Sequence, residues 1–109
     1  MIVVTTPTVS GSEISDVLGL VRGSSIRSKH AGKDIIAAMR NLAGGEIYEY
    51  TKMLAQAREQ AVDRMIEEAQ LLDADAVVSV RFQTSMVMRG AAEMLCYGTA
   101  VRLARTDDE

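Results

Sequence analysis

The chain has 109 residues, of which 48% are hydrophobic and 25% charged, so it fits one globular domain with a modest core. Its net charge of −3 argues against a general nucleic-acid-binding protein, which carries a basic face. No apolar run approaches the roughly 18 residues that span a membrane. Cys96 is the only cysteine, so no disulfide can form within the chain. Together with the lack of a basic and apolar leader, these features predict a cytoplasmic protein that binds neither nucleic acid nor membrane.

The N-terminal part of the chain has the chemistry of strands. Ile2 to Thr5 is short and β-branched and ends before Pro7, which predicts a strand followed by a turn. From Ile14 to about Lys29, apolar residues are interrupted by Gly19 and Gly23. Glycines inside a strand indicate bends or bulges, so we expect one long, kinked strand or two short ones here.

Two helices are predicted in the middle of the chain. Lys33 to Ala43 is a short one, and Gly44-Gly45 ends it because glycine readily takes the left-handed conformation at a helix C-terminus. Residues 46–72 form a long amphipathic helix of roughly 40 Å. It exceeds what a domain of this size needs to cover its own sheet, so we expect part of it to contact another chain. The predicted inner face comprises Ile47, Tyr50, Leu54, Ala57, Ala61, Met65, Ala69 and Leu72.

Two more strands follow the long helix. Residues 75–88 and 93–103 alternate in polarity, with a predicted hairpin turn at Arg89-Gly90-Ala91. The order β-β-α-α-β-β predicts an α+β domain over residues 1–104, with two consecutive helices packed on a mainly antiparallel sheet. Residues 105–109 are expected to form an acidic, disordered tail. One predicted face of the first of these strands comprises Ala76, Val78, Val80, Phe82, Met86 and Met88.

Five short motifs resemble those of a known family. They are Thr5-Thr6-Pro7-Thr8, Gly44-Gly45 followed by Tyr48-Glu49, Ala57-Arg58-Glu59-Gln60-Ala61, Ala74-Asp75-Ala76-Val77-Val78 and Gly98-Thr99-Ala100-Val101. From Met1 to Leu103 the chain is similar to the YbjQ family, which is often labelled a "putative heavy-metal-binding" domain. The resemblance implies an α+β subunit that assembles into a homo-oligomeric ring, typically a pentamer or a multiple of it, with strands added across subunit borders. Candidate structural or assembly residues within these motifs are Gly44, Gly45, Tyr48, Arg58 and Gly98.

The chain departs from the family pattern in three places. Glu46-Ile47 follow the glycine pair, where the family usually has Arg-Ser. Asp73 stands before Ala74, where a glycine is usual. The strand after Val78 carries no carboxylate, whereas the family often has a glycine and then acidic residues there. The third departure argues against an inherited metal site.

Cys96 and His30 are the candidate metal ligands, because they are the only thiol and imidazole side chains. A structural zinc site needs four such ligands, although a ring could bring several copies of Cys96 to its axis. Cys96 lies in an apolar alternation beside Met94, which is typical of an inert core cysteine. His30 precedes a predicted helix, which is typical of a solvated loop residue. We therefore predict no cofactor.

Catalytic constellations are not visible in the sequence. A nucleophile needs a neighbouring base, and carboxylates such as Glu59 and Asp63 lie on the predicted polar helix face. Arg58 lies close to the apolar stripe, where an unpaired charge is costly, so we expect a carboxylate or carbonyl partner, with Glu93 as a candidate. The sequence thus predicts a non-enzymatic, self-assembling protein whose subunit borders could bind a small ligand or ion. The alternatives are a heavy-metal-binding or metal-stress protein, and an enzyme using carboxylates at subunit borders.

Overall fold

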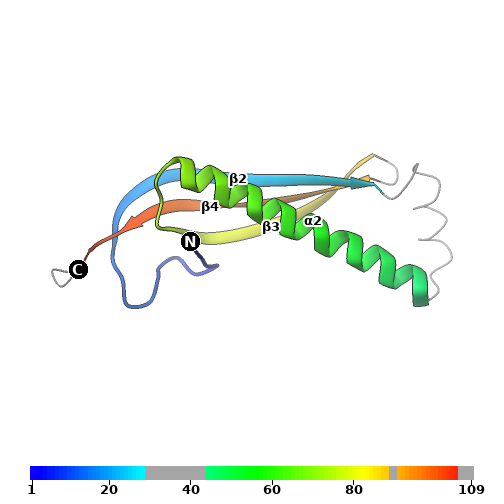
Figure 1. Cartoon of the computed structure of the whole chain (residues 1–109), viewed down its shortest axis with the longest axis horizontal. Coiled ribbons are helices and arrows are strands. Elements are labelled where there is room, and N and C mark those ends of the chain that lie inside the picture. Colours follow the sequence, from blue (N-terminus) through cyan, green and yellow to red (C-terminus); the bar gives the residue numbers. More distant parts are fainter. Residues whose placement is uncertain (29–43, 89–90, 106–109) are drawn as a thin grey trace.

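The computed structural model describes residues 1–28, 44–88 and 91–105 (Figure 1). The predicted helix over Lys33 to Ala43 lies outside the described residues. Of the two options for residues 14–29, one long strand is the correct one. The elements, in chain order, are β1 (Ile2–Val3), β2 (Ile14–Ser28), α2 (Gly44–Leu71), β3 (Ala76–Met88) and β4 (Ala91–Leu103).

The strands form one four-stranded sheet in the order β1-β3-β4-β2. β4 is antiparallel to both of its neighbours, which confirms the predicted pairing of β3 with β4, while β1 is parallel to β3. Of the predicted turn, residues 89–90 lie outside the described residues, and Ala91 is the first residue of β4. The α+β class is confirmed, with a mixed sheet on which the described residues place a single helix, α2.

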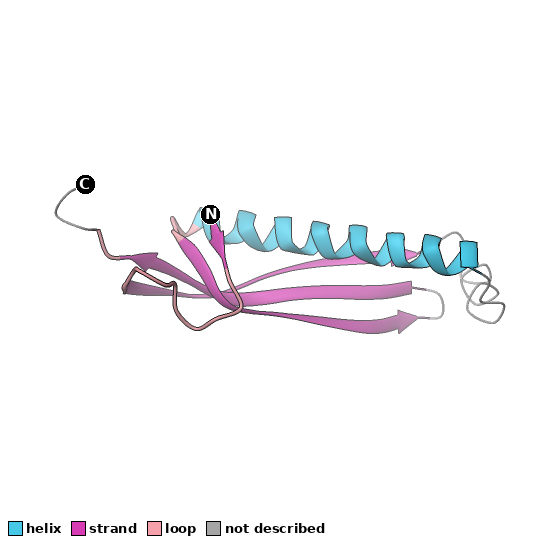
Figure 2. Ribbon diagram, turned by 90° about the horizontal axis from the view of Figure 1, so that it is seen from below, coloured by secondary structure: helices cyan, strands magenta, loops and turns pink. Residues whose placement is uncertain are grey.

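The molecule is long and thin, with the helix lying lengthwise on one face of the sheet (Figure 2). It measures 60 × 23 × 18 Å, and its radius of gyration is 17.6 Å. A compact chain of this length would have a radius of gyration of about 13 Å. Two thin layers therefore share a narrow core, and much of the sheet lies near an edge.

The main core lies between α2 and the sheet. Small side chains at Ala57, Ala61 and Ala69 are buried with Met65, which confirms the centre of the predicted inner face. These alanines let α2 approach the sheet so closely that a Cβ at Gly23 would overlap the backbone of Ala61 and Met65. The sheet contributes Val21, Val77, Val80, Met94, Cys96 and Ala100 to this core.

A bulge in β3 changes the predicted faces of that strand. Ser79 has a φ of 54°, and the register with β4 shifts between Val78 and Arg81. The extra residue turns Val80 to the helix side, whereas Val78 packs with Ala76 on the opposite face. The prediction of one common face was therefore wrong. The N-terminal segment braces the bulge, because Thr6 O accepts the Ser79 N–H at 2.9 Å.

The C-terminus of α2 is closed by backbone hydrogen bonds around Asp73, whose φ is 58°. The Ala74 N–H donates to Ala69 O at 3.1 Å, and the Asp73 N–H donates to Gln70 O at 3.0 Å. This is the pattern of a Schellman motif, with Asp73 in the left-handed position that glycine usually fills. The departure from the family pattern at this position thus keeps the glycine conformation.

Candidate functional site

The outer edge of β2 is the longest edge of the sheet. β2 is the last strand in the sheet order and pairs with β4 from Ile14 to Ser28. Its register is regular from Gly19 onward, so alternate residues direct their N–H and C=O groups away from β4. Apolar side chains on this edge strand face solvent on the side opposite the helix: Val17 (70% exposed), Leu20 (64%) and Ile26 (60%).

The outer edge of β3 is covered only near its start. β1 pairs with Ala76 and Val77. The residues that follow β1 in the chain form backbone hydrogen bonds to β3 as far as Val80, whose N–H donates to Val4 O at 3.1 Å. Beyond that point no strand of the described chain lies outside β3. The side chain of Phe82, on the helix side of this stretch, is 45% exposed.

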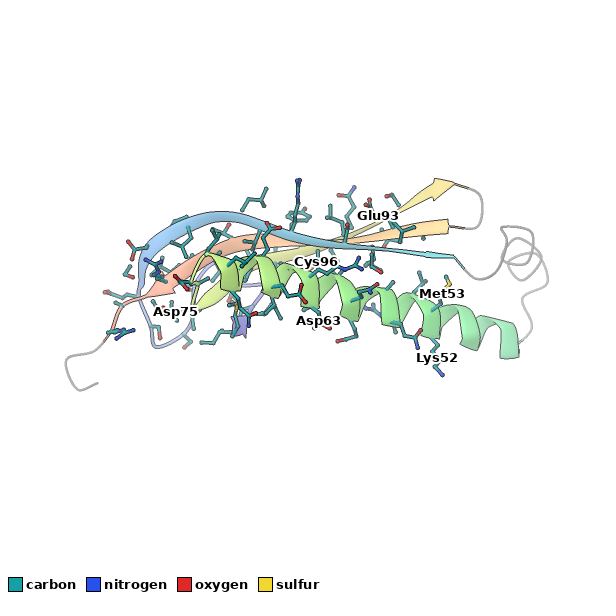
Figure 3. The ribbon with its side chains drawn as sticks, turned by 45° about the horizontal axis from the view of Figure 1, so that its top comes forward. Lys52, Met53, Asp63, Asp75, Glu93 and Cys96 are labelled. Atoms are coloured by element: carbon teal, nitrogen blue, oxygen red, sulfur yellow. The ribbon has the colours of Figure 1, made fainter. Side chains whose placement is uncertain are left out.

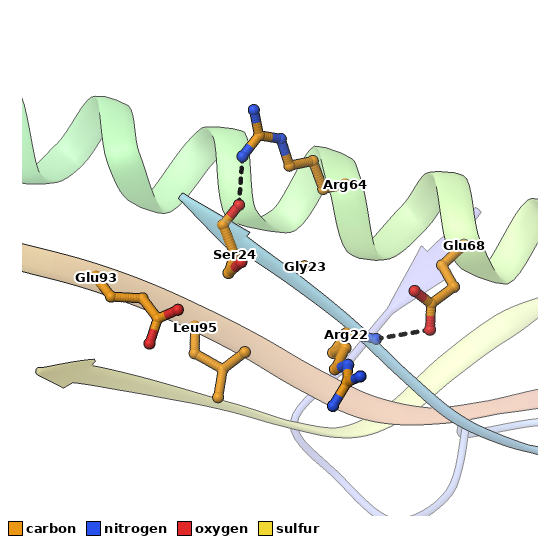
Figure 4. Close-up of a pocket in the computed structure, with 7 residues that line it drawn as sticks. All are labelled: Arg22, Gly23, Ser24, Arg64, Glu68, Glu93 and Leu95. Atoms are coloured by element: carbon orange, nitrogen blue, oxygen red, sulfur yellow. Dashed lines mark hydrogen bonds between the residues drawn. The ribbon is translucent and has the colours of Figure 1, made fainter. Parts of the chain in front are cut away.

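Side chains from α2 reach over the β2 edge, as Figure 4 shows. Glu68 Oε1 accepts a hydrogen bond from the Arg22 N–H at 3.3 Å, and Arg64 Nη1 donates to Ser24 O at 2.5 Å. A hollow of about 570 Å³ surrounds these contacts. Charges of both signs line it, from Arg22, Arg64, Glu68 and Glu93.

A second hollow, of about 670 Å³, lies at the N-terminal end of β2, beside Ser15 and Asp16. There Arg102 donates from Nε to Asp73 O at 3.2 Å and from Nη2 to Leu72 O at 3.3 Å. Asp75 Oδ2 accepts the Leu103 N–H at 2.8 Å. These bonds satisfy carbonyls at the end of α2 and tie the helix to β4, so the polar groups here already serve the fold.

Cys96 lies between the helix and the sheet (Figure 3) and is fully buried. Its Sγ is 3.5 Å from Met65 Sδ. Burial raises the pKa of the Cys96 thiol above its ordinary value, which favours the neutral form, whereas metals bind the thiolate. His30 lies outside the described residues, and within the described part no three His, Cys, Asp or Glu side chains are arranged to hold a metal ion.

The predicted structural or assembly residues have different positions. Gly44 and Gly45 belong to α2 itself, which begins two residues earlier than predicted, and the side chain of Tyr48 is outside the described residues. Gly98 is buried opposite the β3 bulge, where a Cβ would lie 2.7 Å from Val77 Cγ1. Arg58 is exposed, so the single chain does not require the carboxylate or carbonyl partner that we expected for it.

Within the described residues, no helix combines the length and the apolar character of a membrane crossing. The fold matches a crystal structure from Pediococcus pentosaceus, described as a protein with unknown function of the DUF74 family. The TM-score is 0.69 at 18% identity, and the match covers 95% of this chain and 98% of the other. The chain therefore has the same α+β fold as that structure.

The chain belongs to the YbjQ family, whose model is described as "Putative heavy-metal-binding" and matches residues 1–104. A UPF0145 protein of Methanosarcina acetivorans is 58% identical over 103 residues, covering 94% of this chain and 97% of that relative. A UPF0145 protein of Thermosipho africanus is 55% identical over 108 residues, covering 99% and 100%. These names state no substrate and no reaction.

Proposed function

We propose that the chain is a non-enzymatic, cytoplasmic subunit that closes into a ring by pairing the β2 edge of one copy with the β3 edge of the next. The observation that carries this proposal is that, within the described residues, the sheet has two different edges along which no further strand is paired. Exposed edges invite strand addition because their backbone groups lack partners within the sheet. A contact between two different edges is head-to-tail, and such contacts close into rings when the rotation permits.

The direction of the strands supports parallel pairing between copies. β2 and β3 are both antiparallel to β4 and therefore run parallel to one another. Rotation about an axis along the strands keeps that direction, so β3 of a second copy would meet β2 in parallel. In β2, the residues whose N–H and C=O groups point away from β4 have their side chains on the face opposite the helix. In β3, the corresponding residues beyond the bulge have their side chains on the helix side. Parallel pairing therefore keeps all helices on one face of the continuous sheet.

The subunit border in this arrangement would include the hollow at the β2 edge. Arg22 and Arg64 supply positive charge there, while Glu68 and Glu93 supply negative charge. A small ligand or ion with polar groups could be held between copies at this place. The pentamer implied by the family resemblance is our proposed ring size.

A proline on the β3 edge tests the strand pairing. Thr84 directs its N–H outward in the stretch beyond β1, and Thr84→Pro removes that N–H while proline is tolerated at a sheet edge. We expect the wild type to show a mass several times 11.8 kDa in light scattering, and the proline variant to show the mass of one chain. Thr84→Ala keeps the N–H and is the matched control. A monomeric wild type would refute the proposal.

Heavy-metal binding remains the second candidate, because the family description names it. The test is metal content after incubation with zinc, copper or cadmium salts, measured by mass spectrometry for wild type and Cys96→Ser. Since the thiol is buried and held neutral, we expect no difference between the two. Stoichiometric uptake that the serine variant loses would establish the metal function instead.

A further inference from the structure

Two side chains of α2 occupy the backbone groups that strand addition to β2 requires. Arg22 and Ser24 both direct their N–H and C=O groups to the outer edge. The Glu68 carboxylate accepts a hydrogen bond from the Arg22 N–H, and the Arg64 guanidinium donates one to the Ser24 C=O. In either strand direction, an added strand would bond these same two groups.

The spacing of the two helix positions is close to the spacing of the two strand residues that their side chains reach. Positions 64 and 68 are four residues apart and lie on one face of the helix, about 6 Å apart along its axis. Two residues of a strand span about 6.6 Å. The acceptor side chain meets a donor, and the donor side chain meets an acceptor, so both contacts have the correct polarity.

We infer that Arg64 and Glu68 form an edge latch, which covers the centre of β2 in the unassembled chain and must open before the β3 edge of another copy can pair there. This inference rests on the proposed function and names how that assembly is controlled. The latch leaves Leu20 and Ile26 outside its reach, so an incoming strand can first contact the flanks of β2. The incoming strand then displaces the side chains of Arg64 and Glu68.

The chemistry of the latch suits reversible opening. Both contacts are made by charged groups at an exposed site, where such bonds are weak because water and salt compete with them. Once released, the guanidinium and the carboxylate are four residues apart on the helix and can pair with one another. Neither group is then left without a partner.

The test compares Arg64→Ala/Glu68→Ala with Lys52→Ala/Glu67→Ala. Each pair removes one positive and one negative charge from exposed positions of the same helix, and alanine favours the helix. Each protein is dissociated, returned to native buffer, and its assembly is followed by light scattering. We expect the latch variant to assemble about tenfold faster than wild type, the factor produced by lowering a barrier by about 1.4 kcal/mol. The control should match the wild type.

The possible outcomes separate this inference from the proposed function. Unchanged assembly kinetics in the latch variant would overturn the latch and leave the ring intact. A folded latch variant that no longer assembles would also overturn it. If the wild type is monomeric and only the latch variant assembles, the latch is supported and the proposed function of the native chain fails. If neither assembles, both fail.

A second measurement keeps the inference testable if the double variant folds poorly. In the dissociated wild type, the amide of Arg22 should exchange with deuterium more slowly than in the single variant Glu68→Ala, because the carboxylate covers that N–H. We expect exchange to become about fivefold or more faster on removal of the carboxylate. Equal exchange rates would show that Glu68 does not hold the edge in solution.

Discussion

Asp73 and Ser79 are the two non-glycine residues with positive φ in the described part of the chain, at 58° and 54°. Both stand where the backbone changes direction, one at the end of α2 and one at the bulge of β3. Aspartate tolerates the left-handed region better than most residues, because its short polar side chain can bond locally. Asp73 can therefore replace the glycine that the family usually has there.

The effect of a substitution at position 73 on stability should depend on whether the new residue tolerates a positive φ, and not on its charge. We expect Asp73→Val to lower the free energy of unfolding by about 2 kcal/mol, because a β-branched side chain is strained at positive φ. Asp73→Gly should be within about 1 kcal/mol of the wild type. Urea denaturation of the three proteins measures this. Equal losses for valine and glycine would instead assign the effect to the lost carboxylate.

Cys96 should make the stability depend on pH in the alkaline range. Its pKa in the folded chain is raised by burial above the ordinary value of 9.0, so the folded state prefers the neutral thiol. The resulting contribution is complete below pH 9 and is lost as the pH rises through the folded-state pKa. Relative to Cys96→Ser, the wild type should therefore lose stability as the pH rises above about 9. A difference that is constant over this range would contradict the assigned burial.

At the scale of elements, the contact between α2 and β2 depends on the absence of a side chain at Gly23. The strand passes directly under the backbone of Ala61 and Met65. Because α2 covers β2 more closely than it covers β3, this crossing fixes how the helix lies on the sheet. It also brings Arg64 and Glu68 to the edge.

Adding a side chain at this crossing should separate the helix from the sheet. We expect Gly23→Val to lower the free energy of unfolding by about 3 kcal/mol, through overpacking. The matched control is Ser24→Val, because this neighbour faces the other side of the sheet and should change stability by less than about 1 kcal/mol. Thermal unfolding followed by circular dichroism compares them. A tolerated valine at position 23 would mean that the helix does not pack this closely.

The sequence predicted the elements that have a strong local pattern and missed what depends on distant partners. The long helix was predictable because the spacing of Ala57, Ala61, Met65 and Ala69 is that of one helical face. The bulge at Ser79 was missed, because its bracing groups come from the N-terminal segment. The contacts of Arg64 and Glu68 were missed as well. The sequence analysis gave neither residue a role, because charged side chains on a helix are usually solvated, and only the fold brings the backbone of β2 beneath them.

At the scale of the whole molecule, the thin two-layer shape gives the sheet two long edges and only a small core between the layers. Among the described residues, the helix α2 alone cannot cover both edges of a subunit of 60 × 23 × 18 Å. Association that continues the sheet would satisfy the remaining backbone groups and cover Leu20 and Ile26. The predicted ring is therefore consistent with the dimensions and with the exposed apolar residues.

Head-to-tail pairing makes a specific prediction for mixtures of blocked subunits. Ile26→Pro blocks only the β2 edge and Thr84→Pro blocks only the β3 edge, so each should be monomeric alone. A mixture retains one intact edge of each kind and should form dimers with one copy of each variant. Native mass spectrometry with one isotope-labelled variant would detect them. Homodimers of either variant alone would indicate a symmetric interface instead.

The pairing of β2 with β4 joins positions from opposite ends of the chain, since Ile14 lies beside Leu103. During synthesis, β2 leaves the ribosome long before the strand that it needs, whereas the hairpin of β3 and β4 can form as soon as both are made. Distant pairings of this kind slow folding, because a long loop must close before any contact offsets its entropy. A nascent chain that ends before β4 would thus carry Val17 and Leu20 on a strand without its neighbour. Until β4 pairs with it, this unpaired strand would be prone to aggregation.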